Sequence, residues 1–207
     1  MRKVIVFGSG GMAKELIQYL ESDGIEILYV VSTEPFNNPA YGYQVRPDID
    51  PAGESADWIL GVAMPDVKRA IVSAHPGGRW TSYAHSSAIV SSWATIGRGC
   101  VFAPQAIVVG DPVIGEFCFF NTNATIGHDS RLGAYSTLFP NTEVCGDCSL
   151  GENCILGIGA YVVPGCRLPS GSKISAGAIV RESYDVPCTV YGDSRGQHRV
   201  KQHADAA

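Results

Sequence analysis

Hydrophobic residues recur at every sixth position over a long stretch of the chain. The series runs without a gap from Val90 to Val180, and neither an α-helix nor an ordinary strand has this period. Its sixteen positions are Val90, Ile96, Phe102, Val108, Ile114, Phe120, Ile126, Leu132, Leu138, Val144, Leu150, Leu156, Val162, Leu168, Ile174 and Val180. A small residue follows nearly every one of them four positions later, with Pro112 and Tyr184 as the exceptions. This pattern predicts a parallel β-helix built from six-residue repeats.

Three such hexads make one triangular coil, so residues eighteen apart stack at the inter-strand spacing of about 4.8 Å. The hydrophobic residue fills the interior of the prism, and the small residue lies beside it at the corner. Glycine often comes directly after the hydrophobic position, where we expect a turn that tolerates no Cβ atom. One prism leaves its outer walls uncovered, and we therefore expect a closed homotrimer.

The first eighty residues have a different pattern, in which short apolar strands alternate with amphipathic helices. Strands are expected at 3–7, 25–31, 58–63 and 80–83, helices at 12–21 and 65–73, and a Pro- and Asn-rich loop at 35–51. This alternation predicts a small Rossmann-like α/β domain over residues 1–83. The β-helix domain is then expected at 84–192, with a C-terminal tail at 193–207.

A glycine-rich turn, Gly8-Ser9-Gly10-Gly11, joins the first strand to the first helix. Such a turn presents free N–H groups and the positive end of a helix dipole, which suits a phosphate group. A purely structural tight turn explains the same residues. The second strand ends in Ser32 rather than in the acidic residue that holds ribose hydroxyls, which argues against an ordinary NAD dehydrogenase.

Charge and hydropathy exclude several classes of function. The net charge is −5 and only 17% of the residues are charged, so a nucleic-acid partner is not expected. The basic residues gather only near the C-terminus, at Arg195, Arg199 and Lys201. No apolar run has the length of a membrane span, and the N-terminus lacks the pattern of a signal peptide. We expect a cytoplasmic protein without membrane insertion.

Seven cysteines raise the question of a metal site or disulfides, above all the pair Cys145 and Cys148. The repeat register answers most of it, because most of these cysteines occupy the small inward position, where a reduced cysteine behaves as a small apolar residue. These inward cysteines are Cys100, Cys118, Cys148, Cys154 and Cys166. Cys145 and Cys188 are expected to be ordinary thiols. His128 is the only histidine within the repeats, which leaves no set of imidazoles for zinc.

The third position of its hexad places His128 on the outside of the prism, with Gly146 stacked on it eighteen residues later. An outward imidazole beside an unobstructed glycine N–H suits a general base next to an oxyanion donor. Asp129 is positioned to hold one imidazole nitrogen and fix the tautomer. The alternative is a solvent-facing histidine in a turn.

The chain as a whole resembles the hexapeptide-repeat sugar acetyltransferases that carry a small nucleotide-binding domain before a left-handed β-helix. This group includes nucleotide-amino-sugar N-acetyltransferases and sialic acid O-acetyltransferases. The segments that carry the resemblance are VIVFGSGGMAKEL, YAHSSAIVSSWATIG and FNTNATIGHDSRLG. The last of these resembles the family's catalytic segment, in which an Asn precedes the His by seven residues.

The resemblance implies acetyl transfer from acetyl-CoA, without a metal, to the amine of a nucleotide-linked 4-amino-4,6-dideoxy sugar for a surface glycan. It assigns catalysis to His128, Asp129 and Gly146. It assigns the remaining contacts to Gly8, Gly10, Gly11 and Asn121 for the sugar nucleotide and to Gly146, Ile158 and Ala176 for acetyl-CoA. O-acetylation of a sugar such as sialic acid and a non-catalytic β-helix scaffold are the alternatives. The sugar, its nucleotide and the acyl chain length stay open.

Overall fold

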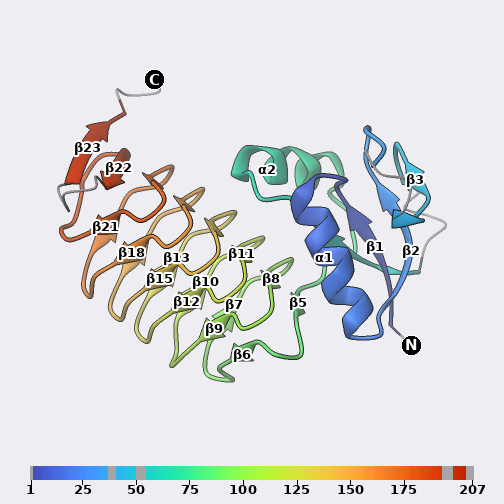
Figure 1. Cartoon of the computed structure of the whole chain (residues 1–207), viewed down its shortest axis with the longest axis horizontal. Helices are drawn as coiled ribbons and strands as arrows, with labels where there is room; N and C mark the ends of the chain where they lie inside the picture. Colours follow the sequence, from blue (N-terminus) through green and yellow to red (C-terminus); the bar gives the residue numbers. More distant parts are fainter. Residues whose placement is uncertain (1, 37–40, 50–54, 193–197, 204–207) are drawn as a thin grey trace.

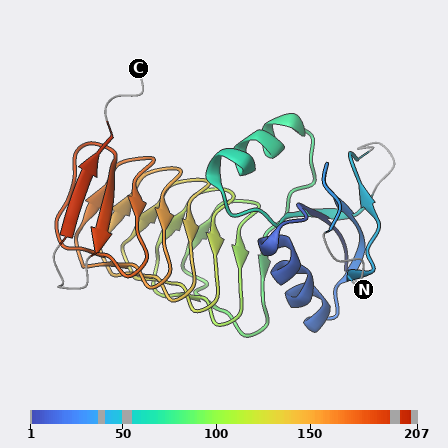
Figure 2. The same ribbon diagram turned by 45° about the horizontal axis from the view of Figure 1, so that its top comes forward.

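A computed structural model describes residues 2–36, 41–49, 55–192 and 198–203 of the protein. The N-terminal third forms an α/β unit, and the rest of the chain winds into a long β-helix beside it (Figure 1). The N-terminus lies at the α/β unit and the C-terminus at the far end of the β-helix (Figure 2). None of the helices in the described part of the chain is long and apolar enough to cross a membrane.

The α/β unit is a four-stranded parallel sheet with the strand order β3-β2-β1-β4 and two helices. Its elements are β1 (Lys3–Phe7), α1 (Gly11–Ser22), β2 (Glu26–Val31), β3 (Val45–Arg46), β4 (Asp57–Leu60) and α2 (Pro65–Ala74). The apolar run of β1 is buried in the centre of the sheet. Helix α1 turns Leu16, Ile17 and Leu20 toward the sheet, as its amphipathic pattern predicts.

The structure corrects the sequence prediction at two places in this unit. Strand β3 lies within the segment expected as a loop, because two residues are too short a run to show a period; residues 37–40, 50 and 51 of that segment lie outside the described residues. The short strand expected at 80–83 is also absent. Trp80 makes a single bridge to Trp58, and Tyr83 begins the β-helix instead.

The β-helix has three walls, each a parallel sheet of strands that are two residues long, except for the longer β22 at the end of one wall. The β11 wall consists of β5 (Tyr83–Ala84), β8 (Val101–Phe102), β11 (Phe119–Phe120), β14 (Thr137–Leu138), β17 (Ile155–Leu156), β20 (Lys173–Ile174) and β22 (Cys188–Gly192). The β12 wall consists of β6 (Ile89–Val90), β9 (Ile107–Val108), β12 (Thr125–Ile126), β15 (Glu143–Val144), β18 (Tyr161–Val162) and β21 (Ile179–Val180). The β13 wall consists of β7 (Thr95–Ile96), β10 (Val113–Ile114), β13 (Arg131–Leu132), β16 (Ser149–Leu150) and β19 (Arg167–Leu168).

The eighteen-residue stacking predicted from the hexads is confirmed throughout, for example by the pairing of Ile126 with Val144. The hydrophobic hexad positions from Phe102 onward are buried and form one continuous core with the small inward residues. The glycines after the hydrophobic positions serve close packing rather than a special φ. A Cβ atom on Gly115, for example, would lie 2.5 Å from the nitrogen of Ala134 in the next coil.

A hairpin ends the β-helix. Strand β22 pairs in parallel with β20 and antiparallel with β23 (His198–Gln202). The segment expected as a tail therefore contains a strand that extends the β11 wall.

The α/β unit packs against the N-terminal end of the β11 wall. Val101 and Phe119, which point outward from this wall, share one hydrophobic core with the buried side of α1. On α2, Lys68 is 1% exposed and its Nζ donates hydrogen bonds to the carbonyl oxygens of Phe117 and Ser136 and to Oγ1 of Thr137. Burial lowers the pKa of Lys68 to about 8. Polar as well as apolar contacts thus join the two parts.

Candidate active site

His128 lies at the corner of the prism between β12 and β13. We call this corner, with those stacked above and below it, the His128 edge. The His128 side chain is 68% exposed, and its Nδ1 lies 2.7 Å from Oδ2 of Asp129. A carboxylate acceptor at Nδ1 favours the tautomer that carries its hydrogen there, so the lone pair is left on Nε2. An exposed lone pair on Nε2 is what a general base needs.

The imidazole of His128 lies directly over Gly146. A Cβ atom on Gly146 would come within 2.6 Å of Cε1 and Nε2, so any other residue would push the ring away. The N–H of Gly146 donates no hydrogen bond to any described residue. The outward direction of His128, its stacking on Gly146 and its bond to Asp129 are confirmed as geometry, and their catalytic roles remain predictions.

Asn121, Ile158 and Ala176 lie on a different edge of the prism, the corner between the β11 and β12 walls, which we call the Ile158 edge. Asn121 is 3% exposed, and its Nδ2 lies 3.5 Å from Oε2 of Glu15 on helix α1. It therefore sits against the α/β unit rather than beside His128. One wall separates the two edges, a distance of at most about 20 Å for six residues at ~3.3 Å each. Within one chain, the predicted residues of the β-helix therefore fall into two groups, one on the His128 edge and one on the Ile158 edge.

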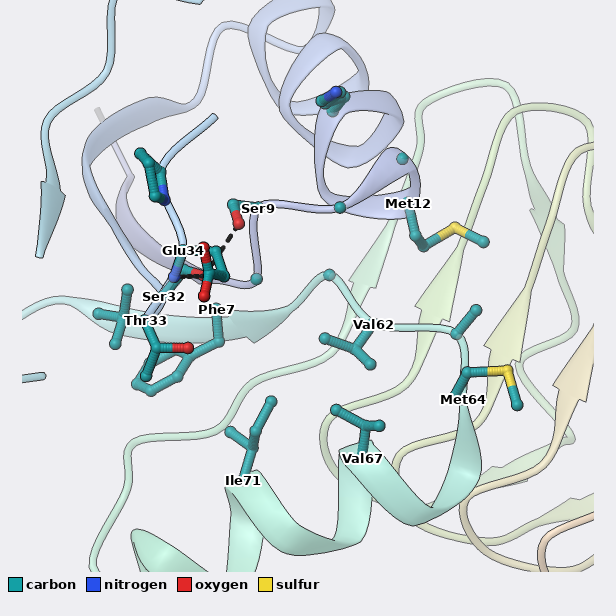
Figure 3. A pocket seen from close by; sticks show the side chains of 18 of the residues that line it. Phe7, Ser9, Met12, Ser32, Thr33, Glu34, Val62, Met64, Val67 and Ile71 are labelled. Atoms are coloured by element: carbon teal, nitrogen blue, oxygen red, sulfur yellow. Dashed lines mark hydrogen bonds between the residues drawn. The ribbon is translucent and has the colours of Figure 1, made fainter. Parts of the chain in front are cut away.

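The glycine-rich turn borders a pocket of about 840 Å³ at the carboxyl ends of β1, β2 and β4 (Figure 3). Gly8 has φ +113°, and a Cβ atom there would lie 2.9 Å from the carbonyl oxygen of Gly61. Gly10 is the N-cap of α1, and no atom lies within 4 Å of where its Cβ would be. The structure thus brings Gly8, Gly10 and Gly11 to the border of this pocket, and Met12 lies between the turn and Asn121.

The pocket has one polar and one apolar side (Figure 3). On the polar side, Oγ of Ser9 and Oγ of Ser32 are 2.9 Å apart, and Ser32 stands where dinucleotide-binding proteins carry an acid. The apolar side comes from the end of β4 and from α2. Its residues are Val62, Met64, Val67 and Ile71. Sequence reasoning missed this side, because the helix was predicted but nothing in its pattern shows which face borders a cavity.

The cysteines follow the repeat register. All seven are free; Cys145 is half-buried and the other six are buried. Cys145 donates a hydrogen bond from Sγ to the hydroxyl of Tyr161 at 3.0 Å. Among the described residues, no group of three or more His, Cys, Asp and Glu side chains is arranged to hold a metal ion.

No protein-family model matches the chain, and no curated protein matches it in sequence. Solved structures do. A mutant of perosamine N-acetyltransferase from Caulobacter crescentus, in complex with CoA and GDP-perosamine, is 25% identical over 98% of each chain, with a TM-score of 0.87. The acetyltransferase domain of PglB from Neisseria gonorrhoeae, in complex with acetyl coenzyme A, is 26% identical over 92% of this chain and 96% of the other, with a TM-score of 0.83.

WeeI from Acinetobacter baumannii has the same fold, at 20% identity, with 97% of this chain and 100% of the other covered and a TM-score of 0.84. Over nearly its whole length, the chain is similar in fold to hexapeptide-repeat acetyltransferases. The resemblance to sugar acetyltransferases of this class, predicted from the sequence, is confirmed by these structural neighbours.

Proposed function

We propose that the protein transfers an acetyl group from acetyl-CoA to the amine of a nucleotide-linked amino sugar used for a surface glycan. The observation that carries this proposal is the exposed His128, bonded to Asp129 and stacked on a glycine whose N–H has no acceptor among the described residues. The likeness to enzymes solved with CoA, acetyl-CoA and GDP-perosamine supports it.

Each step of the proposed reaction is assigned to a residue of the His128 edge. The amine nitrogen attacks the thioester carbon while Nε2 of His128 accepts the proton that the amine loses. The carbonyl oxygen gains negative charge, which the N–H of Gly146 stabilises. The carbon–sulfur bond then breaks, the amide forms, and CoA leaves as a thiol with the proton from the imidazolium. Asp129 keeps the imidazole oriented throughout, and no covalent bond to the protein forms.

The pocket of the α/β unit suits the nucleotide. The N-terminus of α1 directs free N–H groups and positive dipole toward the cavity, which favours a diphosphate beside Gly10 and Gly11. The apolar side offers a surface for a flat base. A volume of about 840 Å³ lies in the range of small-molecule sites. Asn121 contacts Met12, which borders the pocket, and we assign Asn121 to the sugar.

A homotrimer explains why the predicted residues occupy two edges. The α/β unit covers the N-terminal end of the β11 wall, and the outward side chains of the β13 wall are mostly polar or charged. The β12 wall between the two edges is more apolar on its outside, with Ile89, Ile107, Thr125, Glu143, Tyr161 and Ile179. Packing of this wall on a neighbouring copy brings the His128 edge of one chain beside the Ile158 edge of the next, with acetyl-CoA between them.

The compartment we propose is the cytoplasm. Seven cysteines without a disulfide fit a reducing environment, because disulfides form and persist mainly in oxidising compartments.

The test is a thiol-release assay with acetyl-CoA and a panel of acceptors. GDP-, UDP- and dTDP-linked 4-amino-4,6-dideoxy sugars provide the amines, and sialic acid provides the hydroxyl control. We expect CoA release with at least one nucleotide amino sugar and a mass increase of one acetyl group on its amine. Release with the hydroxyl acceptor alone would establish O-acetylation instead, and a total lack of release would contradict the proposal. Light scattering tests the trimer, which has a mass of about 66 kDa as three chains of 22.0 kDa.

A further inference from the structure

The corner that precedes His128 in the stack, residues 109–112, departs from the regular repeat. Pro112 takes the place of the usual small residue, and Gly110 has φ +76°. At most other corners a residue in the left-handed region donates its N–H to the main-chain carbonyl nineteen residues earlier, as Asp147 does to His128 at 3.0 Å. The N–H of Gln105 donates instead to Oγ of the Ser87 side chain, at 3.2 Å. Asp129 likewise bonds to a side chain. Its N–H donates to Oδ1 of the Asp111 side chain, at 3.1 Å.

This replacement occurs at the residue that orients the imidazole. Asp129 has φ +59°, a conformation that is unfavourable for a residue with a Cβ atom and therefore depends on its surroundings. Its Oδ2 lies 2.7 Å from Nδ1 of His128, the preceding residue in the chain. Because the two residues are adjacent, the backbone torsions at Asp129 set where its carboxylate meets the imidazole. A group that fixes the N–H of Asp129 therefore fixes this pair.

The same corner also makes room for the histidine. A Cβ atom on Gly110 would lie 2.6 Å from Cβ and 2.9 Å from Cα of His128. The glycine is needed for this close approach, and the Asp111 carboxylate one residue further on supplies the acceptor. The stacking of Val108 on Ile126 and of Val113 on Arg131 holds residues 109–112 directly before His128 in the prism.

We propose that Asp111 is a positioning residue for His128 and Asp129, a role that rests on the proposed function of this edge. Its carboxylate holds the Asp129 N–H, as a hydrogen bond to an ionised acceptor that is stronger than one to a carbonyl. Asp129 then keeps Nδ1 of His128 protonated and Nε2 free above Gly146. Asp111 itself touches no reacting atom in this mechanism.

Three substitutions at one position separate geometry from charge. Asp111→Ala removes the acceptor and should lower kcat by about 10-fold to 100-fold, the range expected when a catalytic group is displaced by about 1 Å. The KM values for both substrates should stay within about twofold. Asp111→Asn keeps an oxygen in place and should restore most of the loss. Asp111→Glu keeps the charge but moves the carboxylate by one methylene, and should restore less than Asn.

Asp147→Asn is the matched control, because it removes the same charge from the next corner beyond His128. It should leave kcat within about twofold, since its carboxylate holds neither residue of the pair. Thermal unfolding and light scattering show whether each variant folds and assembles. If Asp111→Ala does not fold, the relative kcat values of Asp111→Asn and Asp111→Glu still test the proposal.

A second measurement does not depend on activity. In protein labelled with ¹⁵N-histidine, the His128 signals, assigned with His128→Ala, should show hydrogen on Nδ1 in the wild type and a mixed tautomer in Asp111→Ala. An unchanged tautomer together with an unchanged kcat in Asp111→Ala would overturn the proposal. Full activity of Asp111→Glu together with an inactive Asp111→Asn would also overturn it. If His128→Ala keeps its activity, the function proposed for the edge fails, and the tautomer still tests the role of Asp111.

Discussion

The two parts of the molecule place their functional groups by different means. In the β-helix, each residue is held between the coils before and after it, so a position along the chain fixes a position in space to within one coil. In the α/β unit, the walls of the pocket come from separate elements, β1, β2, β4 and α2, and their relative placement depends on packing. The rigid ladder carries the groups proposed for chemistry, and the turns of the α/β unit carry those proposed for recognition.

This difference teaches how a substitution should act in each part. On the His128 edge, a side chain is crowded from both neighbouring coils, and a change there alters the geometry of the reacting groups. At the glycine-rich turn, Gly10 faces open space. A larger side chain there would contact only a bound ligand. The first kind of change should appear in kcat and the second in KM.

The largest effect is expected at His128. His128→Ala removes the proposed base and should lower kcat by about 10²-fold to 10⁴-fold, while the proposed trimer and the affinity for acetyl-CoA stay intact. Steady-state kinetics with the true acceptor measure kcat and KM, and light scattering checks the assembly.

Asp129→Asn provides a graded comparison. The imidazole remains and only its orientation changes, so the loss should be smaller than for His128→Ala. A His128→Ala enzyme that retained more than half of the wild-type kcat would show that the β-helix edge is not the place of the chemistry.

A smaller effect is expected at the glycine-rich turn. Gly10→Val places a branched side chain in the space proposed for the diphosphate, and KM for the sugar nucleotide should rise by about tenfold or more, equivalent to ~1.4 kcal/mol of lost binding free energy. The KM for acetyl-CoA should stay nearly unchanged. Gly77→Val is the control, because a Cβ atom there also meets nothing within 4 Å and Gly77 lies outside the pocket. An equal rise in both KM values for Gly10→Val would show that the turn is structural.

The two parts also differ in how far their sequences predict them. The hexad period predicts the strand register, the inward residues and the contact of His128 with Gly146, because a stacked repeat leaves no freedom in the register. Asp111 could not be found in this way. Its bond to the N–H of Asp129 replaces a regular main-chain bond, and the signals in the sequence are the irregular Gly110 and Pro112.

In the α/β unit, alternation predicts the main strands and both helices but not the pocket. Ser32 and Gly10 could be placed from the strand ends, whereas Met64 and Val67 border the cavity only because of the way α2 packs. The sequence motif also did not predict that Asn121 and His128 lie apart. Seven residues of spacing in a six-residue repeat put the two on different edges, and a motif alone does not show this.

Lys68 joins the two parts, and its loss should cost less than the ligand effects above. Lys68→Met removes three hydrogen bonds and leaves their acceptors without this donor, a penalty of about 1–3 kcal/mol. Release of a buried charge offsets part of it, so we expect a net destabilisation of about 1 kcal/mol at pH 7. Denaturation at one protein concentration measures it. An unchanged free energy of unfolding would show that apolar packing alone holds the two parts together.

The difference in stability between the wild type and Lys68→Met should depend on pH, and the direction of this dependence can be predicted. Burial lowers the pKa of Lys68 to about 8 in the folded protein, from 10.5 for a free lysine. Between these values the unfolded chain binds more protons than the folded one, so the stability of the wild type should rise with pH relative to Lys68→Met. Taking the difference between the two proteins removes the contribution of thiols and tyrosines that titrate in the same range. A difference that falls with pH would contradict the assignment.

The smallest effect is expected at Cys145, which tests the register of the β-helix without touching its chemistry. Burial raises the pKa of the Cys154 thiol to about 12 and also raises the pKa values of Cys148, Cys166 and Cys188, so these thiols should react slowly with a disulfide reagent in the folded protein. Cys145 is half-buried and should supply the one faster thiol per chain. Cys145→Ser should abolish that phase while activity stays within about twofold, as for a substitution outside the core. Several fast thiols, or one zinc ion bound through Cys145 and Cys148, would show that the coils are not stacked as the hexads require.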